Sequence, residues 1–187
     1  LDLSGTQQLH GKSPAELLVN LAKEIEIELN LSISIGLSEN RFLAKLASSI
    51  QKPRAFTVIG KEEKLDIISD LPVTCIPGVG PSLSKKLKRD SIERFHHLIN
   101  LDLKTLKNRY GSYGERLWYL ARGEDSKIIK PNSLRKSISK ELTFDFDLSK
   151  ETELKKALWV LSENVSAKLK SKGIVGKTVT LKLKRFN

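Results

Sequence analysis

The sequence has few of the features that mark a secreted or membrane protein. Its 187 residues include one cysteine, Cys75, so no disulfide can form within the chain. No apolar run approaches the roughly 20 residues that span a bilayer, and no signal-peptide segment opens the chain. Methionine is absent even at position 1, and Leu1-Asp2-Leu3 has the pattern of a strand already under way. We therefore expect a soluble piece of a longer protein from a reducing compartment, with Cys75 as a buried apolar residue.

Acidic residues are the minority, and they are unevenly spread. The chain has 22 Asp and Glu against 33 Lys and Arg, a formal net charge of +11. Counted along the chain, residues 1–71 have a net charge of −2, residues 72–125 of +4 and residues 126–187 of +9. A near-neutral body followed by two basic parts favours a partner that is a polyanion. A solvated basic surface without a partner is the alternative.

The first third of the chain alternates between strand and helix patterns. A capping box at Ser13 and Glu16 starts a helix that runs to about residue 29. Further along, the patterns predict strands at 31–37 and 55–59 and helices at 40–51 and 61–70. This order is typical of an α/β layer with helices on one face.

The strand at 31–37 alternates strictly, which assigns its side chains to two faces. The face expected to point to a core carries Leu31, Ile33, Ile35 and Leu37, and the other carries Ser32, Ser34 and Gly36. We expect the face with small residues to be open to a ligand. Arg41, Lys45 and Lys52 form a basic stripe along the following helix, which is either a solvated face or a line of phosphate contacts above the open sheet.

A Gly-Val-Gly turn at residues 78–80 dominates the middle of the chain. Gly78 and Gly80 allow a tight turn and a close approach of the backbone to a bulky ligand. Pro81 suits the first position of a helix whose free amides attract anions, and Lys85 and Lys86 follow on that helix. The pattern resembles the helix-hairpin-helix motif, which holds a nucleic-acid backbone by its phosphates. A plain tight turn between two helices is the alternative.

The rest of the chain reads as short helices followed by a basic α/β unit. Helices are expected at 92–99, 103–110 and 113–122, with Trp118 in the core, and then a polar linker at 126–134. Beyond it the sequence predicts strands at 138–148 and 178–184 around a helix at 149–172. Two strands and one helix bury too little surface to be stable alone.

Four blocks of sequence resemble the Y-family translesion DNA polymerases of the DinB type. They occur in family order and span almost the whole chain. The blocks are SIGLSENRFLAKLAS at 34–48 with Lys52-Pro53, LPVTCIPGVG at 71–80, RYG at 109–111 with ARGED at 121–125, and RKSI at 135–138 with ELTF at 141–144.

The resemblance implies an α+β multidomain fold. The expected parts are the C-terminal part of an open-faced α/β palm at 1–71, a small all-α helix-hairpin-helix thumb at 72–125, the linker at 126–134 and the first part of an α/β little finger at 135–187. In the family, two Mg²⁺ ions activate the primer 3′ hydroxyl and stabilise the leaving pyrophosphate. By this alignment their carboxylate ligands lie upstream of Leu1, so we expect no catalytic residue and no metal ligand in this chain.

The resemblance also implies binding roles for particular residues. Lys52 matches a palm lysine that contacts the incoming triphosphate, and Arg41 and Lys45 share its stripe. The expected DNA contacts are Gly78, Val79, Gly80, Lys85, Lys86, Arg135, Lys136, Ser137, Lys182 and Lys184. The sequence departs from the family at Pro81, where a lysine is common, which leaves the hairpin to bind through its amides and the later lysines.

Two functions from different classes remain open at this point. The first is a part of an error-prone translesion DNA polymerase, a bacterial cytoplasmic enzyme acting on primer-template DNA and deoxynucleoside triphosphates. Its expected partner is a sliding clamp, bound by the intact protein, and we expect this piece to be monomeric and not membrane-bound. The second is a non-catalytic helix-hairpin-helix DNA-binding module of a repair protein. A helix-hairpin-helix glycosylase or nuclease is disfavoured, because an α/β sheet precedes the hairpin.

Overall fold

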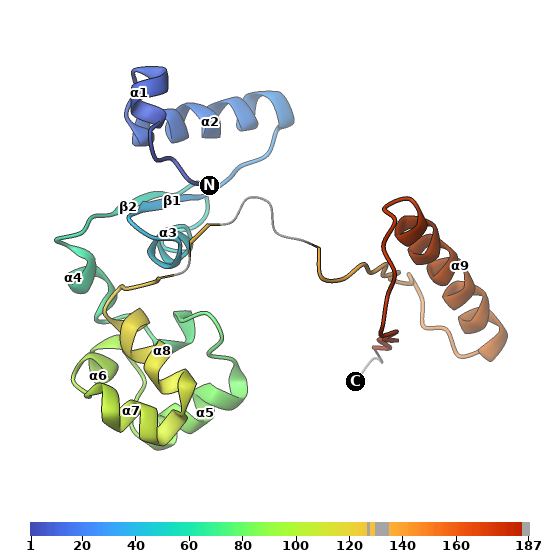
Figure 1. Ribbon diagram of the computed structural model, residues 1–187. Coiled ribbons are helices and arrows are strands. Elements are labelled where there is room, and N and C mark those ends of the chain that lie inside the picture. The colour runs from blue at the N-terminus through green and yellow to red at the C-terminus, as the bar shows by residue number, and fades with distance from the viewer. Residues whose placement is uncertain (127, 130–134, 185–187) are drawn as a thin grey trace. The chain divides into compact units, whose positions relative to one another are not determined.

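The computed structural model describes residues 1–126, 128–129 and 135–184 (Figure 1). The chain divides into two compact units, residues 1–129 and residues 130–187. The described residues combine helices with one two-stranded sheet, which confirms an α+β class. In these described ranges no helix is long and apolar enough to cross a membrane. Most of the predicted linker at 126–134 lies outside the described residues.

The first unit contains both strands and most of the helices. Its elements in chain order are α1 (Thr6–His10), α2 (Pro14–Leu29), β1 (Ile35–Ser38), α3 (Arg41–Ala47), β2 (Phe56–Ile59), α4 (Lys64–Ile68), the 3-10 turn η1 (Val73–Cys75), α5 (Pro81–Arg89), α6 (Phe95–Ile99), α7 (Leu103–Tyr110) and α8 (Ser112–Ala121). The predicted capping box of α2 is present: Ser13 Oγ accepts from the Glu16 amide and the Glu16 carboxylate accepts from the Ser13 amide. The predicted strand at Leu1–Leu3 does not form, and α1 follows it where a loop was expected.

The two strands are parallel and lie directly against α3. Their register pairs Ile35 with Phe56 and Ser38 with Ile59, so Gly36 and Ile59 share one face of the sheet. A Cβ added at Gly36 would lie 2.0 Å from the Ala44 carbonyl oxygen, which belongs to α3. The missing side chain at Gly36 therefore allows the helix to pack onto the strand at backbone distance.

The packing of α3 on Gly36 shows that the prediction of which face of the sheet is open was wrong. The small residues of β1 were expected to leave their face free for a ligand, yet Gly36 points at α3. On the opposite face Phe56 and Val58 are 37% and 48% exposed, and Leu31, expected in the core, is exposed and lies outside the strand. The alternation correctly separated two faces, but small side chains served the close approach of a helix instead of a ligand.

A single hydrophobic core joins α3 to the helices that follow the hairpin. Phe42 of α3 stacks on Phe95 of α6, with ring centroids 6.4 Å apart. Leu43, Leu98 and Leu117 are fully buried in the same cluster. Figure 1 shows α5 to α8 gathered into a bundle. Trp118 packs against this cluster, as predicted.

The second unit is built around α9 (Glu151–Lys170), close to the predicted helix. Its apolar stripe, which includes Leu154, Leu161 and Leu169, is only half-buried. The predicted strands at 138–148 and 178–184 are wrong for residues 135–184, where the structure has no strand. Side chains such as Val179, which is 99% exposed, have no core to enter, and a pair of strands without further partners is marginal in water.

Candidate nucleic-acid interface

The hairpin is a tight turn held by buried apolar residues on either side. Ile76 and Val79 are buried, and the Val79 amide donates to the Ile76 carbonyl over 3.0 Å. Gly78 has a φ of 99°, which favours glycine. Val79, predicted as a DNA contact, thus has its side chain in the core and its amide already bonded. It shapes the turn, and only the backbone of Gly78 and Gly80 remains to face a ligand.

Helix α5 begins directly after the turn, as the sequence predicts. Gly80 is its N-cap residue, Pro81 is at the first helical position, and no side chain caps the helix. The amides of a first helical turn have no partner within the helix, and the positive end of the helix dipole lies there. In the part of the chain that is described, no hydrogen bond is found from the amides of Gly78 and Gly80. The turn therefore presents donors for an anion.

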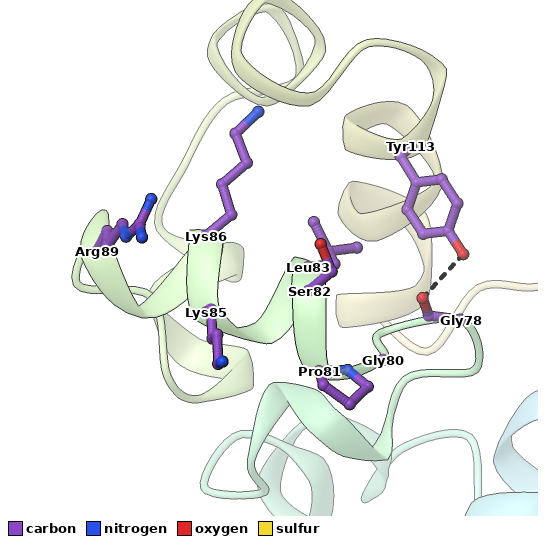
Figure 2. Close-up of a pocket in the computed structure, with 9 residues that line it drawn as sticks. All are labelled: Gly78, Gly80, Pro81, Ser82, Leu83, Lys85, Lys86, Arg89 and Tyr113. Carbon is purple, nitrogen blue, oxygen red and sulfur yellow. Dashed lines mark hydrogen bonds between the residues drawn. The ribbon is translucent and has the colours of Figure 1, made fainter.

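A groove of about 800 Å³ opens at this turn (Figure 2). It brings together the hairpin, the start of α5 and a tyrosine from α8. Its lining residues are Gly78, Gly80, Pro81, Ser82, Leu83, Lys85, Lys86, Arg89 and Tyr113. The lining includes three cations and no carboxylate, so the groove suits a phosphate backbone. Four predicted residues, Gly78, Gly80, Lys85 and Lys86, meet here.

Tyr113 is a part of this site that sequence reasoning missed. Its hydroxyl donates to the Gly78 carbonyl oxygen over 3.1 Å, drawn as the dashed line in Figure 2. A Cβ added at Gly78 would lie 1.9 Å from that hydroxyl. Tyr113 thus fixes the turn from a distant helix. No local signal marks it, since it is one of several aromatic residues in an amphipathic helix.

The two neighbouring lysines of α5 have different surroundings. Lys86 Nζ donates to the Arg109 carbonyl over 3.0 Å and lies 4.9 Å from the centroid of the Tyr110 ring. Tyr110 in turn donates to the Asp90 carboxylate. Burial, together with this hydrogen bond, raises the pKa of Tyr110 well above its usual value. Lys86 therefore helps to join α5 to α7.

Lys85 has no hydrogen bond or ion pair among the described residues, and it lines the groove. Arg89, one turn further along α5, also lines it and was not assigned a site role from the sequence. The nearby Lys88 instead lies 3.9 Å from the Glu93 carboxylate. Lys85 and Arg89 are thus the cations of α5 best placed for a phosphate.

A second, smaller pocket of about 250 Å³ lies between α3 and the entry to the hairpin. It collects two of the three residues predicted to bind a nucleotide, Lys45 and Lys52. Cys75 and Pro77 line its other side. Cys75 is half-buried, and burial raises the pKa of its thiol, as expected of an unreactive apolar cysteine. Arg41 does not line this pocket; its Nε lies 3.2 Å from Asp125 Oδ2.

The predicted contacts of the C-terminal unit are all exposed. Arg135, Lys136 and Ser137 lie in an extended segment without strand pairing. Lys182 Nζ lies 3.5 Å from the Glu141 carboxylate, which brings the two segments predicted as strands side by side. Lys184 is exposed. Their role in DNA binding remains a prediction.

The described ranges contain no cluster of three or more His, Cys, Asp or Glu side chains that could hold a metal ion. These residues therefore do not fit a two-metal centre.

Comparison with known proteins gives matches along most of the chain. Residues 1–49 match the impB/mucB/samB family, residues 74–125 the thumb domain of DNA polymerase-iota, and residues 135–187 the C-terminal domain of the impB/mucB/samB family. Over 98% of its length the chain is 44% identical to DNA polymerase IV of Caulobacter vibrioides and 45% identical to that of Brucella melitensis. The chain belongs to the DinB type of Y-family DNA polymerases. DNA polymerase IV 1 of Mesorhizobium japonicum is 46% identical over the same share.

This DinB-type chain spans less than half the length of these relatives, between 41% and 46% of each. The thumb-domain match includes the hairpin, α5 and Tyr113, so the groove lies inside a region that the family shares. The resemblance drawn from the four sequence blocks is confirmed.

Proposed function

We propose that this chain is the DNA-gripping part of an error-prone translesion DNA polymerase. In the intact protein, residues 1–71 would belong to the palm, 72–125 form the thumb, 126–134 the linker and 135–187 the start of the little finger. The observation that carries the proposal is the groove at Gly78–Gly80, where free amides, a helix N-terminus and cations converge without a carboxylate. A non-catalytic DNA-binding module is not favoured, because the relatives that are 44–46% identical to 98% of this chain are all named DNA polymerase IV or DNA polymerase IV 1.

The groove would hold the primer strand through its phosphates. The amides of Gly78 and Gly80 would donate to one phosphate, while Lys85 and Arg89 would lie beside the next. Arg135, Lys136, Ser137, Lys182 and Lys184 would contact the backbone through the C-terminal unit. Such contacts position the duplex and do not distinguish one sequence from another.

The smaller pocket would contact the incoming nucleotide. Lys45 and Lys52 line it from the end of α3 and the turn that follows, and two ammonium groups suit a triphosphate. Polymerisation requires divalent metal ions, and Mg²⁺ is our proposal for this family member. We propose that the metal ligands and the catalytic residues of the intact protein lie outside this chain.

The proposal extends to the setting of the intact enzyme. It would act in the bacterial cytoplasm on nucleoid DNA, using primer-template DNA and deoxynucleoside triphosphates as substrates. A sliding clamp would be its protein partner, and this chain alone would be a monomer.

Binding of a labelled primer-template to the 187-residue chain tests the proposal. Fluorescence anisotropy between 50 and 300 mM NaCl should give an affinity that falls steeply with salt, with a slope of about −0.9 for each phosphate contacted. Duplexes of unrelated sequence should bind equally well. A flat salt response, or strong sequence dependence, would contradict a phosphate grip. Primer extension by this chain in the presence of Mg²⁺ would contradict the assignment of catalysis to residues outside it.

A further inference from the structure

Four residues connect the start of α3 to the segment that follows α8. We call this group the α3–α8 latch: Asn40, Arg41, Gly123 and Asp125. Asn40 Oδ1 accepts from the Leu43 amide over 2.9 Å and so caps α3. The other end of the same amide group, Nδ2, donates to the Gly123 carbonyl over 2.8 Å. One side chain thus begins one element and fixes the end of another, 83 residues away.

The adjacent ion pair has one buried member. Arg41 Nε lies 3.2 Å from Asp125 Oδ2, and the two side chains are 46% and 9% exposed. A carboxylate that is nine-tenths buried requires compensation of its charge, and Arg41 supplies part of it. By contrast, the Arg54–Glu26 pair, at 2.6 Å, has both side chains well exposed, at 69% and 45%.

The segment after α8 also packs tightly on the helices beneath it. Gly123 has a φ of 71°, and a Cβ added there would lie 3.1 Å from Lys64 Cδ and 3.4 Å from Leu43 Cδ1. Lys64 is itself held by Glu39, with Nζ 2.8 Å from the carboxylate oxygen. The latch therefore has hydrogen bonding, an ion pair and van der Waals contact at the same place.

We propose that Asn40 and Arg41 are positioning residues that hold the thumb helices against α3. Helix α3 also leads into the nucleotide pocket, which it lines with Lys45 opposite Cys75 and Pro77 of the hairpin entry. The latch at the start of α3 and the packing at its end would keep the hairpin groove and the nucleotide pocket at a constant distance and orientation. Arg41 thereby changes from an expected triphosphate contact to a support for Asp125. The roles of the two sites in binding DNA and nucleotide rest on the proposed function. The latch as a structural contact does not.

A cycle of thermal unfolding measurements tests the ion pair in the whole chain. Arg41→Gln and Asp125→Asn should each lower Tm, Arg41→Gln by roughly 3–6 °C, and the double variant should be no less stable than the worse single one. Arg41→Lys, which keeps the charge, should recover part of the loss. Arg54→Gln is the matched control and should change Tm by about 1 °C or less. Strict additivity of the two substitutions would overturn the pairing.

Distances between spin labels test the positioning role. In a Cys75→Ala background, labels on cysteines replacing Glu62, in the turn between β2 and α4, and Lys104, in α7, report how the thumb helices lie against the α3 side. We expect a narrow distance distribution that broadens in Arg41→Gln and in Asn40→Asp, and that stays narrow in Arg54→Gln. Asn40→Asp keeps the cap acceptor but replaces the donor to Gly123 by a charged carboxylate oxygen, so it breaks the latch without uncapping α3. An unchanged distribution in both latch variants would overturn the proposal.

Titration with inorganic tripolyphosphate, followed by NMR, tests the change of role. Lys52→Gln should weaken binding several-fold, while Arg41→Gln should stay within about twofold of the parent chain. If Arg41→Gln loses as much tripolyphosphate affinity as Lys52→Gln while the label distances stay unchanged, Arg41 contacts the triphosphate directly and the proposal is wrong. If Lys52→Gln and Lys45→Gln both bind like the parent, the nucleotide pocket is wrong, and the label distances alone decide the latch.

Discussion

Gly78 and Gly80 lie two positions apart in the hairpin, yet the structure uses them differently. Gly78 is in the left-handed region and has the Tyr113 hydroxyl where a Cβ would be. Gly80 is extended, and a Cβ there meets no atom within 4 Å. A side chain at Gly78 therefore disturbs the protein, whereas a side chain at Gly80 enters only the space a ligand would use.

We expect Gly80→Asn to lower DNA affinity about 5- to 10-fold without lowering Tm. Asparagine is favoured at a helix N-cap, so α5 should remain intact while the new side chain obstructs the phosphate. Gly78→Asn, the paired variant, should lower both Tm and affinity. Anisotropy and calorimetry measure the two effects. Unchanged affinity in Gly80→Asn would mean that the phosphate does not approach this amide.

Lys85 and Lys86 offer a comparison between adjacent lysines. Lys85→Gln should reduce the salt slope of DNA binding by about 0.9, the value of one phosphate contact, and leave Tm unchanged. Lys86→Gln should instead lower Tm by about 2 °C, because the Arg109 carbonyl and the Tyr110 ring lose their cation. The reverse pattern would show that Lys86, and not Lys85, binds the backbone.

Sequence could not have separated these two lysines. Both follow the hairpin on a basic helix, and the partners that occupy Lys86 lie on α7, more than 20 residues away. Tyr113 escaped notice for the same reason. Spacing along the chain identified the turn and its helix, whose conformations are local, but it contains no information on which side chains arrive from other helices.

Helix α7 shows how a single cap sets the start of an element. Asp102 accepts from the Thr105 amide over 2.7 Å and from the Thr105 hydroxyl, and both bonds favour the charged carboxylate. The side-chain bond and then the backbone bond from Thr105 lower the pKa of Asp102 below 3.8. A lowered pKa in the folded state stabilises the protein above the unfolded value, and this stability is lost as the pH falls through the folded value.

Asp102→Ala should therefore lower Tm at pH 7, and the difference from the parent should shrink as the pH falls below 3.8. Asp147→Ala, which removes an exposed carboxylate in the C-terminal unit, is the control and should leave Tm at pH 7 unchanged. Calorimetry between pH 2.5 and 7 measures both. A difference that grows towards acid pH would contradict the assigned cap.

The contact between β1 and α3 predicts a large effect from one methyl group. In Gly36→Ala the new Cβ would lie 2.0 Å from the Ala44 carbonyl and 2.3 Å from the Ser48 amide, both of them backbone atoms that cannot swing away. We expect the free energy of unfolding to fall by about 2 kcal/mol. Gly176→Ala, whose Cβ meets nothing within 4 Å, is the control. Equal stability of the two variants would mean that α3 lies further from the strand.

Sequence patterns predicted where a helix begins better than they predicted what packs against a helix or strand. The capping box predicted at Ser13 and Glu16 formed, because such a cap depends only on residues three positions apart. The alternation in β1 separated two faces but could not say which face a helix would cover. The strands predicted at 138–148 and 178–184 had the right alternation, yet a strand needs a neighbour, which the pattern of one segment does not supply.

At the scale of the whole molecule, the sequence was sufficient to predict the distribution of charge along the chain and the family. The net charge of +9 over residues 126–187 contrasts with −2 over residues 1–71, and it is readable from composition alone. The family followed from short motifs that lie in turns and helix starts, and the comparisons confirm it. Composition could not show which cations along the chain already have a partner within the protein. Arg41, Lys86 and Lys182 each have one: Asp125, the Arg109 carbonyl and Glu141.

Removing charge from the C-terminal unit should weaken DNA binding at all sequences alike. We expect the double substitution of Lys182 and Lys184 by Gln to reduce the salt slope by about 1 to 2 and to leave Tm within about 2 °C, since both side chains are exposed. Replacing Lys12 and Lys23, in the near-neutral first part, is the control and should leave the slope unchanged. An equal loss in both pairs would indicate a general charge effect without a defined contact.

The bond from Tyr113 to Gly78 also has a consequence for the order of events during synthesis. The two residues are 35 positions apart, so a growing chain has made the whole turn well before its anchor exists. At typical synthesis rates of roughly 5–20 residues per second, the interval is on the order of a few seconds. During that time the new hairpin lacks the hydroxyl that fixes it. The turn of a nascent chain should thus become fixed only when α8 has emerged.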